Sequence, residues 1–379
     1  MIKMTAAVMY EQGLPAPYEK SQPFKIEEVD LDGPGPGEVL VEVRAAGLCH
    51  SDLSQVKGLR KRQLPVVGGH EAAGIVRELG AGVSGLSEGD HVVMTVVAGC
   101  GACARCRSGR PALCEAVTLP RTKGLLANGQ RRLSRNGQPL YHYSGVSGFA
   151  EYAVTMPASL VRIDPSIPLD VAALFGCAVV TGAGAVLNTA EVQSGASVVV
   201  VGLGGVGLNS IMAARIAGAS IIIGIDTRPD KFTIAQELGA THTLDGNDGD
   251  LAAQVKDLTG GGVDFVFDIT GAGPVMAYAP EMLHPGGQVI CIGLGASDTR
   301  HDYNHAALVS QERTIRGSFM GSCVPERDIP HYMDLFSAGK MPVDRLKSHA
   351  IGFDRLNVSL DLLNGGDVIR QVLLPHGRL

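Results

Sequence analysis

The segment 198–208, VVVVGLGGVGL, constrains the fold of this chain more than any other stretch of the sequence. Four consecutive valines are typical of a strand buried in a parallel sheet. The glycines that follow predict a tight turn into a helix over about residues 208–217. The spacing of Gly202, Gly204 and Gly207 leaves room for a pyrophosphate against the N–H groups at the helix N-terminus. The segment therefore predicts a dinucleotide-binding site.

A second strand predicted over residues 220–225 supports this interpretation. It ends at Asp226, about 20 residues beyond the glycines, where a carboxylate can bind the adenosine ribose. Further strands are predicted over 264–268 and 288–292, and helical segments over 231–238 and 276–283. This alternation predicts a doubly wound parallel sheet. A glycine-rich structural turn without a ligand is the alternative.

The length of 379 residues exceeds what one hydrophobic core usually supports, so two domains of roughly 150 to 200 residues are expected. Hydrophobic residues make up 45% and charged residues 18%, a balance typical of a folded soluble protein. A formal net charge of −6 argues against a nucleic-acid partner, since the basic run 60–62 is short. The N-terminus does not resemble a signal peptide, and no apolar run reaches the ~18 residues of a membrane span. The cytoplasm is the expected compartment.

The first 97 residues differ from the dinucleotide-binding part. Short runs with alternating apolar and polar residues are bounded by Gly/Pro turns, which predicts a β-rich, barrel-like domain. Residues 118–143 are polar and contain Asn-Gly pairs, so an excursion made of turns is expected there. The segment 367–374 alternates again, which predicts that the C-terminal end rejoins the first domain.

Eight cysteines in a chain without an export signal are expected to be reduced, and a clustered set of them is more typical of a metal site than of disulfides. Four thiols can close a tetrahedron around one Zn²⁺ and leave no open position, which predicts a structural zinc. An iron–sulfur cluster and a nucleic-acid-binding zinc ribbon are the alternatives. Arg105, Arg107 and Arg110 are expected to donate to the sulfurs. The four ligands are Cys100, Cys103, Cys106 and Cys114.

Two polar insertions in the β-rich part predict a second metal centre. The first places Cys49, His50, Ser51 and Asp52 in succession, and the second contains the pair His70-Glu71. A His-Glu pair alone is often structural, but together with the first insertion it is a candidate zinc centre. Further along, Cys177 lies between glycines, which suggests a thiol at a crowded site where domains meet; a buried, inert thiol is the alternative.

Taken in this order, these motifs resemble those of the zinc-dependent medium-chain alcohol dehydrogenases, members of the medium-chain dehydrogenase/reductase superfamily. The resemblance runs nearly end to end. It implies a GroES-like β-rich catalytic domain over 1–180 with a structural zinc lobe over about 98–116, a Rossmann nicotinamide-dinucleotide-binding domain over 181–322, and a C-terminal return over 323–379. The excursion resembles that of the longer dimeric members, which implies a homodimer.

The resemblance also implies the roles of residues near the catalytic zinc. Cys49, His70 and Cys177 would be its protein ligands, with two zinc ions in each chain. The zinc would act as a Lewis acid on a primary or secondary alcohol, which would be oxidised reversibly to the aldehyde or ketone by hydride transfer to NAD. Ser51 would take the alcohol proton, and Asp52 would orient the imidazole of His70. Glu71 matches an acid beside the metal.

Several further residues match cofactor contacts of the family. His50 and Arg370 match contacts to the pyrophosphate, Thr181 matches a residue packed against the nicotinamide, and Lys231 matches a contact to the adenosine ribose. Asp226 would repel a 2′-phosphate, although Arg228 could attract one, so NAD is favoured over NADP. Together with Asp226, the residues of the turn expected to bind the cofactor are Gly202, Gly204, Gly205, Val206 and Gly207.

One position departs from the family pattern. Many members have a histidine five residues after the first cysteine ligand, where it ends a proton relay, and this chain has Ser54. Substrate identity is not readable from the sequence, although Val96 and Leu294 match positions that line the substrate pocket. Two other functions stay open: a glutathione-linked formaldehyde dehydrogenase, and a catalytically silent relative that binds a dinucleotide.

Overall fold

The computed structural model describes residues 1–296 and 298–378. By their mutual contacts, these residues divide into two units. Unit 1 comprises Met1–Cys177, Val324–His331 and Val343–Leu379, and unit 2 comprises Ala178–Cys323 and Tyr332–Pro342. Unit 1 therefore contains both ends of the chain. The predicted domain boundaries at residues 181 and 322 stay a prediction.

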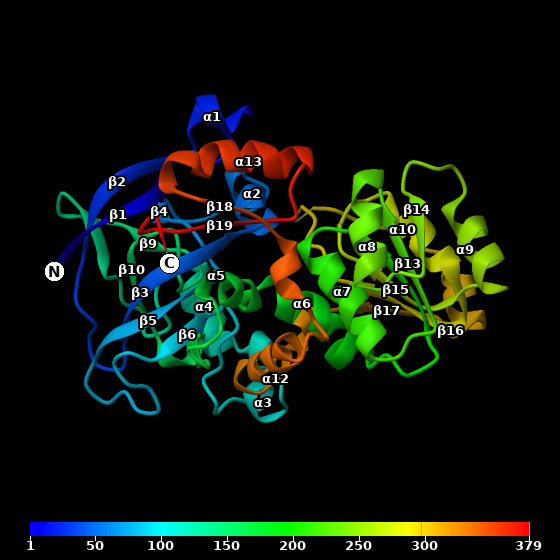
Figure 1. Cartoon of the computed structure of the whole chain (residues 1–379), viewed down its shortest axis with the longest axis horizontal. Coiled ribbons are helices and arrows are strands. Elements are labelled where there is room, and N and C mark those ends of the chain that lie inside the picture. Colours follow the sequence, from blue (N-terminus) through cyan, green and yellow to red (C-terminus); the bar gives the residue numbers. More distant parts are fainter. Residues whose placement is uncertain (297, 379) are drawn as a thin grey trace. The chain divides into compact units, whose positions relative to one another are not determined.

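Unit 2 is built on a six-stranded sheet in which all neighbouring strands run parallel (Figure 1). The valine run forms the third strand of this sheet, and Val198 to Val201 are buried because strands lie on both sides of it. Since the strand order reverses direction at this strand, the doubly wound sheet is confirmed. In spatial order the strands are β14 (His242–Asp245), β13 (Ile221–Asp226), β12 (Ser197–Val201), β15 (Val263–Asp268), β16 (Leu283–Cys291) and β17 (Thr314–Gly317).

Helices connect these strands and cover them. Apolar side chains of the helices over residues 251–259 and 275–278 form one core with the strands, centred on residues such as Val199, Ile223 and Val266. The helix after the glycines begins at Gly205, three residues earlier than predicted, because Gly204 has extended backbone angles and caps it. The helices are α6 (Ala178–Gly184), α7 (Gly205–Ile216), α8 (Phe232–Leu238), α9 (Leu251–Thr259), α10 (Val275–Tyr278) and α11 (His305–Ser310).

Unit 1 contains two mixed sheets, as predicted for a β-rich domain. The first has the order β8 (Gln138–Pro139), β7 (Leu133–Arg135), β2 (Phe24–Leu31), β1 (Ile2–Met9), β4 (Val66–Val67) and β9 (Tyr141–His142). The second has the order β11 (Leu160–Arg162), β6 (His91–Met94), β5 (Ala72–Leu79), β3 (Val39–Leu48), β19 (Arg370–Leu373) and β18 (Lys347–Ile351), and β10 (Tyr152–Thr155) also pairs with β3. Their buried faces form two apolar cores.

The last strand, β19, lies in the same sheet as β3, although more than three hundred residues separate the two in sequence. β19 pairs antiparallel with β3, with Leu373 opposite Ala46 and Gln371 opposite Leu48. This pairing brings Arg370 next to a strand that ends at Leu48, directly before Cys49. The α-helices outside unit 2's sheet connections are α1 (Tyr18–Ser21), α2 (His50–Val56), α3 (Ala104–Arg107), α4 (Glu115–Thr122), α5 (Leu169–Ala172), α12 (Pro325–Ser337) and α13 (Leu356–Gly365).

The excursion over residues 118–143 is more regular than predicted. It begins inside helix α4 and contributes β7, β8 and β9 to the first sheet. β7 and β8 form a hairpin whose loop is Asn136-Gly137, with φ values of 49° and 73°. Positive φ at both loop positions matches the twist of a two-residue hairpin. The Asn-Gly pair therefore connects two paired strands, where the sequence predicted only turns.

No single helix of the described residues is long and apolar enough to cross a membrane. The helical segments Leu169–Gly176 and Ala178–Ala190 pass that test only when they are taken together, and most of their residues are buried in the protein.

Candidate active site

The junction of β3 and α2 positions the first group of predicted site residues. Cys49 has extended backbone angles and caps α2, and Oδ2 of Asp52 accepts a hydrogen bond from the Cys49 N–H at 2.9 Å. An acidic residue at the third helical position satisfies an N–H that no helical carbonyl can reach. The cap therefore holds Cys49 and Asp52 in a defined relation at the start of the helix.

His70 lies in the segment between β4 and β5. Its Nδ1 is 3.0 Å from Oδ1 of Asp52, so one carboxylate joins the cap of α2 to this imidazole. The other ring nitrogen, Nε2, is buried and has no hydrogen-bond partner among the described residues. A metal ion would bind the neutral ring through Nε2, with Nδ1–H donating to Asp52.

Cys177 completes this group at the end of unit 1. Its thiol, the thiol of Cys49 and a ring nitrogen of His70 all lie within 4.8 Å of one another, and all three side chains are buried. The segment before Cys177 passes so close to the end of β6 that position 176 requires glycine. A Cβ there would lie 2.4 Å from the Met94 carbonyl oxygen. Two sulfurs and one imidazole nitrogen at this separation fit the open, three-ligand zinc site typical of catalytic centres.

Glu71 and Arg370 form an ion pair next to these ligands. Oε1 of Glu71 lies 3.1 Å from Nη1 of Arg370, and both side chains are almost fully buried. Gly47 makes room for the pair, since a Cβ at that position would lie 2.1 Å from the Glu71 carboxylate. Arg370 also lies close enough to Cys49 and Cys177 for its charge to act on both thiols. The positive charge of Arg370 is therefore surrounded by potential anions.

Burial and neighbouring charges shift the pKa values of Cys49, His70 and Glu71. A hydrogen bond with the Cys177 thiol holds the pKa of Cys49 well below its usual range, and Arg370 acts in the same direction. Burial alone would lower the pKa of His70, but Asp52 and Cys177 raise it well above the usual value. Burial raises the pKa of Glu71 to about 7, although Arg370 opposes that shift.

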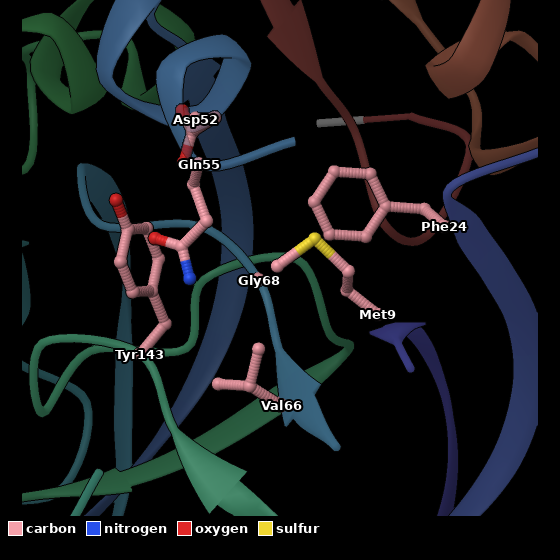
Figure 2. A pocket seen from close by; sticks show the side chains of 7 residues that line it. All are labelled: Met9, Phe24, Asp52, Gln55, Val66, Gly68 and Tyr143. Carbon is pink, nitrogen blue, oxygen red and sulfur yellow. The ribbon is translucent and has the colours of Figure 1, made fainter. Parts of the chain in front are cut away.

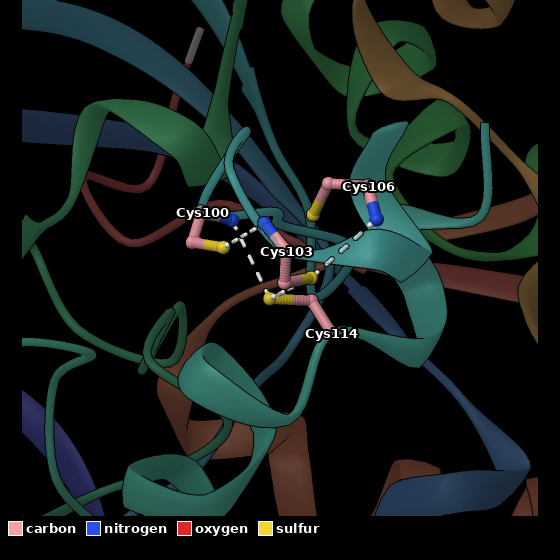
Figure 3. A group of neighbouring side chains, drawn as sticks. All are labelled: Cys100, Cys103, Cys106 and Cys114. Atoms are coloured by element: carbon pink, nitrogen blue, oxygen red, sulfur yellow. Dashed lines mark hydrogen bonds between the residues drawn. The ribbon is translucent and has the colours of Figure 1, made fainter. Parts of the chain in front are cut away.

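The four-cysteine group lies in the lobe that contains α3 (Figure 3). All four sulfurs lie within 4.8 Å of one another, and Sγ of Cys103 is 3.8 Å from Sγ of Cys114. A tetrahedron with Zn–S bonds of about 2.3 Å has edges of about 3.8 Å, so this set fits a closed zinc site. The backbone N–H groups of Ala102 and Cys103 lower the pKa of Cys100 to about 6.

The donors to these sulfurs differ from the prediction. The N–H of Cys103 donates to Cys100, the N–H of Cys106 donates to Cys103, and the N–H of Cys100 donates to Cys114. None of the arginines of the lobe donates to a sulfur within the described part of the chain. Backbone groups perform that role because the loop winds closely around the four thiols.

The glycine-rich turn of unit 2 has the geometry that its spacing implies. Gly202 has φ +99°, which favours glycine, and its N–H donates to the Ile225 carbonyl at 2.7 Å. A Cβ on Gly207 would lie 1.8 Å from the Gly202 carbonyl oxygen, so only glycine allows α7 to start this close to β12. A Cβ on Gly204 would meet nothing within 4 Å. The space beside the N-terminus of α7 is therefore open to a ligand.

Asp226 lies at the end of β13, facing this turn. Its Oδ2 accepts a hydrogen bond from the Leu203 N–H at 2.7 Å and lies 3.4 Å from Nζ of Lys231. Its Oδ1 accepts from the Arg228 N–H, while the Arg228 guanidinium lies 3.1 Å from Asp230. The carboxylate of Asp226 is thus held beside the glycines.

The other predicted residues are placed as follows. Ser51 and Ser54 are half-buried on α2, and His50 is exposed at its first turn. Thr181 lies on α6 in unit 2, with its hydroxyl 3.6 Å from Sδ of Met320. Arg370 was predicted to contact the pyrophosphate; the structure places it in the buried pair described above, and the pyrophosphate contact stays a prediction.

Sequence reasoning missed one aromatic residue of the site. The ring of Tyr143 packs edge-on against His70 with centroids 5.6 Å apart, and burial raises the pKa of Tyr143 to about 12. Its position in a polar segment gave no local signal, because the contact spans more than seventy residues of sequence.

Comparisons with known proteins agree with this geometry. The model of the alcohol dehydrogenase GroES-like domain matches residues 35–165, and that of the zinc-binding dehydrogenase matches residues 205–338. S-(hydroxymethyl)glutathione dehydrogenase of Escherichia coli O1:K1 / APEC is 39% identical over 376 residues, covering 98% of this chain and 100% of the relative.

Two solved structures are similar along nearly the whole chain. A zinc-binding domain protein of the alcohol dehydrogenase type from Burkholderia ambifaria has a TM-score of 0.93 and 35% identity, covering 99% of this chain and 100% of that one. Benzyl alcohol dehydrogenase from Acinetobacter calcoaceticus has a TM-score of 0.92 and 31% identity, covering 99% of each chain.

Proposed function

Since this chain belongs to the zinc-dependent medium-chain alcohol dehydrogenases, we propose that it oxidises a primary or secondary alcohol reversibly to the aldehyde or ketone with NAD as hydride acceptor. The observation that carries the proposal is the buried set of Cys49, His70 and Cys177, in which Nε2 of His70 has no protein partner. A silent dinucleotide-binding relative would have no reason to keep an orphaned ring nitrogen between two buried thiols.

Each residue of this set has a role that follows from its contacts. Cys49, His70 and Cys177 would hold one zinc, and the four-cysteine group would hold a second. Bound zinc supplies Lewis acidity toward the alcohol oxygen, and NAD supplies the hydride acceptor. Asp52 keeps the proton of His70 on Nδ1 and fixes the plane of the ring.

Ser51 is the residue proposed to accept the alcohol proton. It lies two positions after Cys49 on the first turn of α2 and is half-buried, so its hydroxyl is neither sealed in the core nor fully in water. Glu71 and Arg370 form a buried ion pair that places a positive charge near both thiols. That charge favours the thiolate forms that bind metal.

The choice of NAD follows from the end of β13. The Asp226 carboxylate lies beside the glycine-rich turn and would accept hydrogen bonds from ribose hydroxyls. A 2′-phosphate there would meet a negative charge, and the guanidinium of Arg228, which could balance it, is paired with Asp230. NADP⁺ used more efficiently than NAD⁺ would contradict this part of the proposal.

The second candidate activity is oxidation of the glutathione adduct of formaldehyde. The observation in its favour is the 37–39% identity to S-(hydroxymethyl)glutathione dehydrogenases along nearly the whole chain. Formaldehyde oxidation that requires added glutathione, at a rate above that with simple alcohols, would select this activity.

The proposal is tested by metal analysis together with NADH formation on a panel of alcohols. We expect about two zinc ions per chain in the parent protein. The variant Cys49→Ser should lose one zinc and the activity, whereas Cys291→Ser, a thiol of unit 2 outside both cysteine groups, should keep both zinc ions. A parent protein with two zinc ions that oxidises neither an alcohol nor the glutathione adduct would overturn the proposed function.

The proposed assembly is a homodimer. β17 lies at the edge of the parallel sheet, pairs with β16 on one side, and exposes all four of its residues. An exposed edge strand can pair with the same strand of a second copy. Light scattering should give twice the mass of one chain, and the mass of a single chain at micromolar concentration would contradict this assembly.

A further inference from the structure

Thr95 is a buried polar residue directly after β6, and its hydroxyl joins two separate segments of unit 1. The side chain is 0% exposed. Its Oγ1 donates a hydrogen bond to the Gly176 carbonyl at 2.8 Å and accepts one from the Val97 N–H at 3.1 Å. A hydroxyl has one proton to donate, so one bond of each kind fixes its direction. Thr95 therefore links the end of β6 to the residue directly before Cys177.

The backbone of Thr95 is held by the sheet. β6 pairs with β11, and the Thr95 N–H donates to the Ser159 carbonyl, directly before β11, at 2.9 Å. The hydrogen bonds between the two strands thus extend one residue past the end of β6. Arg121 of α4 braces the same place, because its guanidinium donates to the Val96 carbonyl and to the Ser159 hydroxyl. The Thr95 hydroxyl therefore projects from a rigid base, as an anchor for another segment requires.

The segment that Thr95 holds is interrupted at the ligand. The 3₁₀ helix η3 (Ala173–Gly176) ends directly before Cys177, and α6 begins directly after it. Cys177 itself has φ −143° and ψ −65°, which are not helical values. Regular helical hydrogen bonds therefore do not determine where its side chain points. A contact from outside these two helices can supply that constraint.

The same end of the sheet also carries the ligand His70. β5 and β6 are neighbours, so the end of β6 lies beside the start of β5, two residues after His70. Gly176 packs closely here, because a Cβ at that position would lie 2.4 Å from the Met94 carbonyl oxygen and 3.4 Å from Cα of Glu71. The hydrogen bond from the end of β6 to Gly176 therefore sets the separation between Cys177 and His70.

Cys49 and His70 depend on a different residue. Asp52 accepts from the Cys49 N–H and faces Nδ1 of His70. Figure 2 shows Asp52 among the residues that line one pocket, together with Tyr143, whose ring packs edge-on against His70. Asp52 thus positions two of the three ligands, and the third arrives on the segment that Thr95 anchors.

We propose that Thr95 is a positioning residue for the zinc of the three-ligand site: its hydroxyl holds Gly176 and thereby places the Cys177 sulfur where it can share the metal ion with the other two ligands. The inference rests on the proposed function, which assigns a zinc ion to this site. A side chain without a hydroxyl would deprive the buried Gly176 carbonyl of this donor and the buried Val97 N–H of this acceptor. The segment could regain partners only by moving, and Cys177 would move with it.

The first test is zinc affinity, measured without substrate by competition with a chromogenic chelator. Thr95→Val has nearly the same shape but no hydroxyl, and should weaken zinc binding at the three-ligand site about tenfold, the low end of the range for residues that orient metal ligands. Thr95→Ser keeps the hydroxyl and should bind zinc as the parent does. Cys49→Ser, which lacks a ligand of this site, identifies which of the two zinc ions is released.

Thr155→Val is the matched control. Thr155 is also 0% exposed, and its hydroxyl also donates to a glycine carbonyl, that of Gly145, at 2.6 Å. It lies on β10 and belongs to neither metal group. The control should lose stability to thermal unfolding, as Thr95→Val does, but keep the parent's zinc affinity. It separates a positioning role from the general cost of losing a buried hydrogen bond.

The second test is the absorption spectrum of Co²⁺ bound in place of zinc. The bands of thiolate-bound cobalt depend on how the two sulfurs and the nitrogen are arranged around it. Thr95→Val should change the bands of cobalt at the three-ligand site, whereas Thr95→Ser and Thr155→Val should reproduce the parent's spectrum. A Thr95→Val protein with the parent's spectrum and a zinc affinity within about twofold of the parent's would overturn the proposal. So would a Thr95→Ser protein as impaired as Thr95→Val.

The two proposals fail in different ways. Zinc affinity and the cobalt spectrum need no substrate, so they test Thr95 even if the parent protein oxidises neither an alcohol nor the glutathione adduct, a result that overturns only the reaction. If Thr95→Val does not fold, Thr95→Ala and Thr95→Ser make the same comparison with smaller side chains. A lower zinc affinity of Thr95→Ala than of Thr95→Ser supports the role of the hydroxyl, and equal affinities overturn it.

Discussion

Replacement of Asp52 by asparagine tests how the zinc-binding state of His70 is maintained. The Asp52 side chain is 1% exposed, and its two oxygens face the Cys49 N–H at 2.9 Å and Nδ1 of His70 at 3.0 Å. Asparagine has nearly the same shape but offers only one oxygen, and its NH₂ group is a donor. The variant therefore cannot accept from both groups.

Either orientation of the asparagine has a cost. With its oxygen toward Cys49, the NH₂ group requires Nδ1 of His70 to accept, so the ring proton moves to Nε2 and blocks the lone pair that binds metal. With its oxygen toward His70, the Cys49 N–H is left buried without an acceptor, which costs about 1–3 kcal/mol. Loss of a carboxylate behind a histidine ligand typically weakens metal binding 10- to 100-fold. We expect a loss of zinc affinity in that range at this centre.

The assay is an equilibrium competition of each protein with a chromogenic zinc chelator, followed by metal analysis. The four-cysteine group is an internal reference, because Asp52 does not contact it, and its zinc should be released as in the parent. Asp90→Asn is the matched control: Asp90 accepts a backbone N–H at 2.8 Å in a surface turn and does not belong to either metal group. Zinc affinity of Asp52→Asn within about twofold of the parent would refute the reasoning.

Four other substitutions test the remaining parts of the site. Asp226→Asn should lower kcat/KM for NAD⁺ more than for NADP⁺, because only the former uses the carboxylate, and Asp257→Asn, at an exposed acid of α9, should not; equal losses for both cofactors would contradict the role. Cys103→Ser should remove one zinc per chain and lower the midpoint of thermal unfolding, and unchanged zinc content would contradict a four-sulfur site. Gly207→Ala places a Cβ 1.8 Å from a carbonyl oxygen and should reduce both stability and NAD binding, measured by thermal unfolding and cofactor fluorescence. Ser54→His should shift the pH profile of alcohol oxidation, and an unchanged profile would count against a relay at this position.

The parts of the site that were predictable are those whose residues are close in sequence. The four cysteines fall within one short segment. A loop that brings them together can place their sulfurs at the corners of a tetrahedron around one zinc ion. The glycine-rich turn was predictable for the same reason: the valine run, the glycines and Asp226 are consecutive parts of one strand, turn, helix and strand unit. The predicted start of α7 was three residues late. Residue type alone does not show that Gly204 has extended backbone angles and caps the helix.

Contacts between distant segments were not predictable from residue patterns. Cys177 joined Cys49 and His70 only through a family resemblance, since nothing local distinguishes a ligand from a buried thiol. The pair Glu71–Arg370 joins residues 299 positions apart, and it forms because β19 pairs with β3. The donors to the lobe's sulfurs were wrongly attributed to arginines, because spacing does not reveal which backbone N–H groups the loop turns inward.

The sequence by itself determined the sheet that binds the dinucleotide, the four-sulfur lobe and the class of chemistry, because each depends on local patterns of chain geometry and donor type. Only the tertiary structure decided how Asp52 is shared between Cys49 and His70, and which buried nitrogens have no acceptor. An unsatisfied donor is a property of everything packed around it, and residues from α2, α4 and β9 come together around one cavity only after the chain has folded.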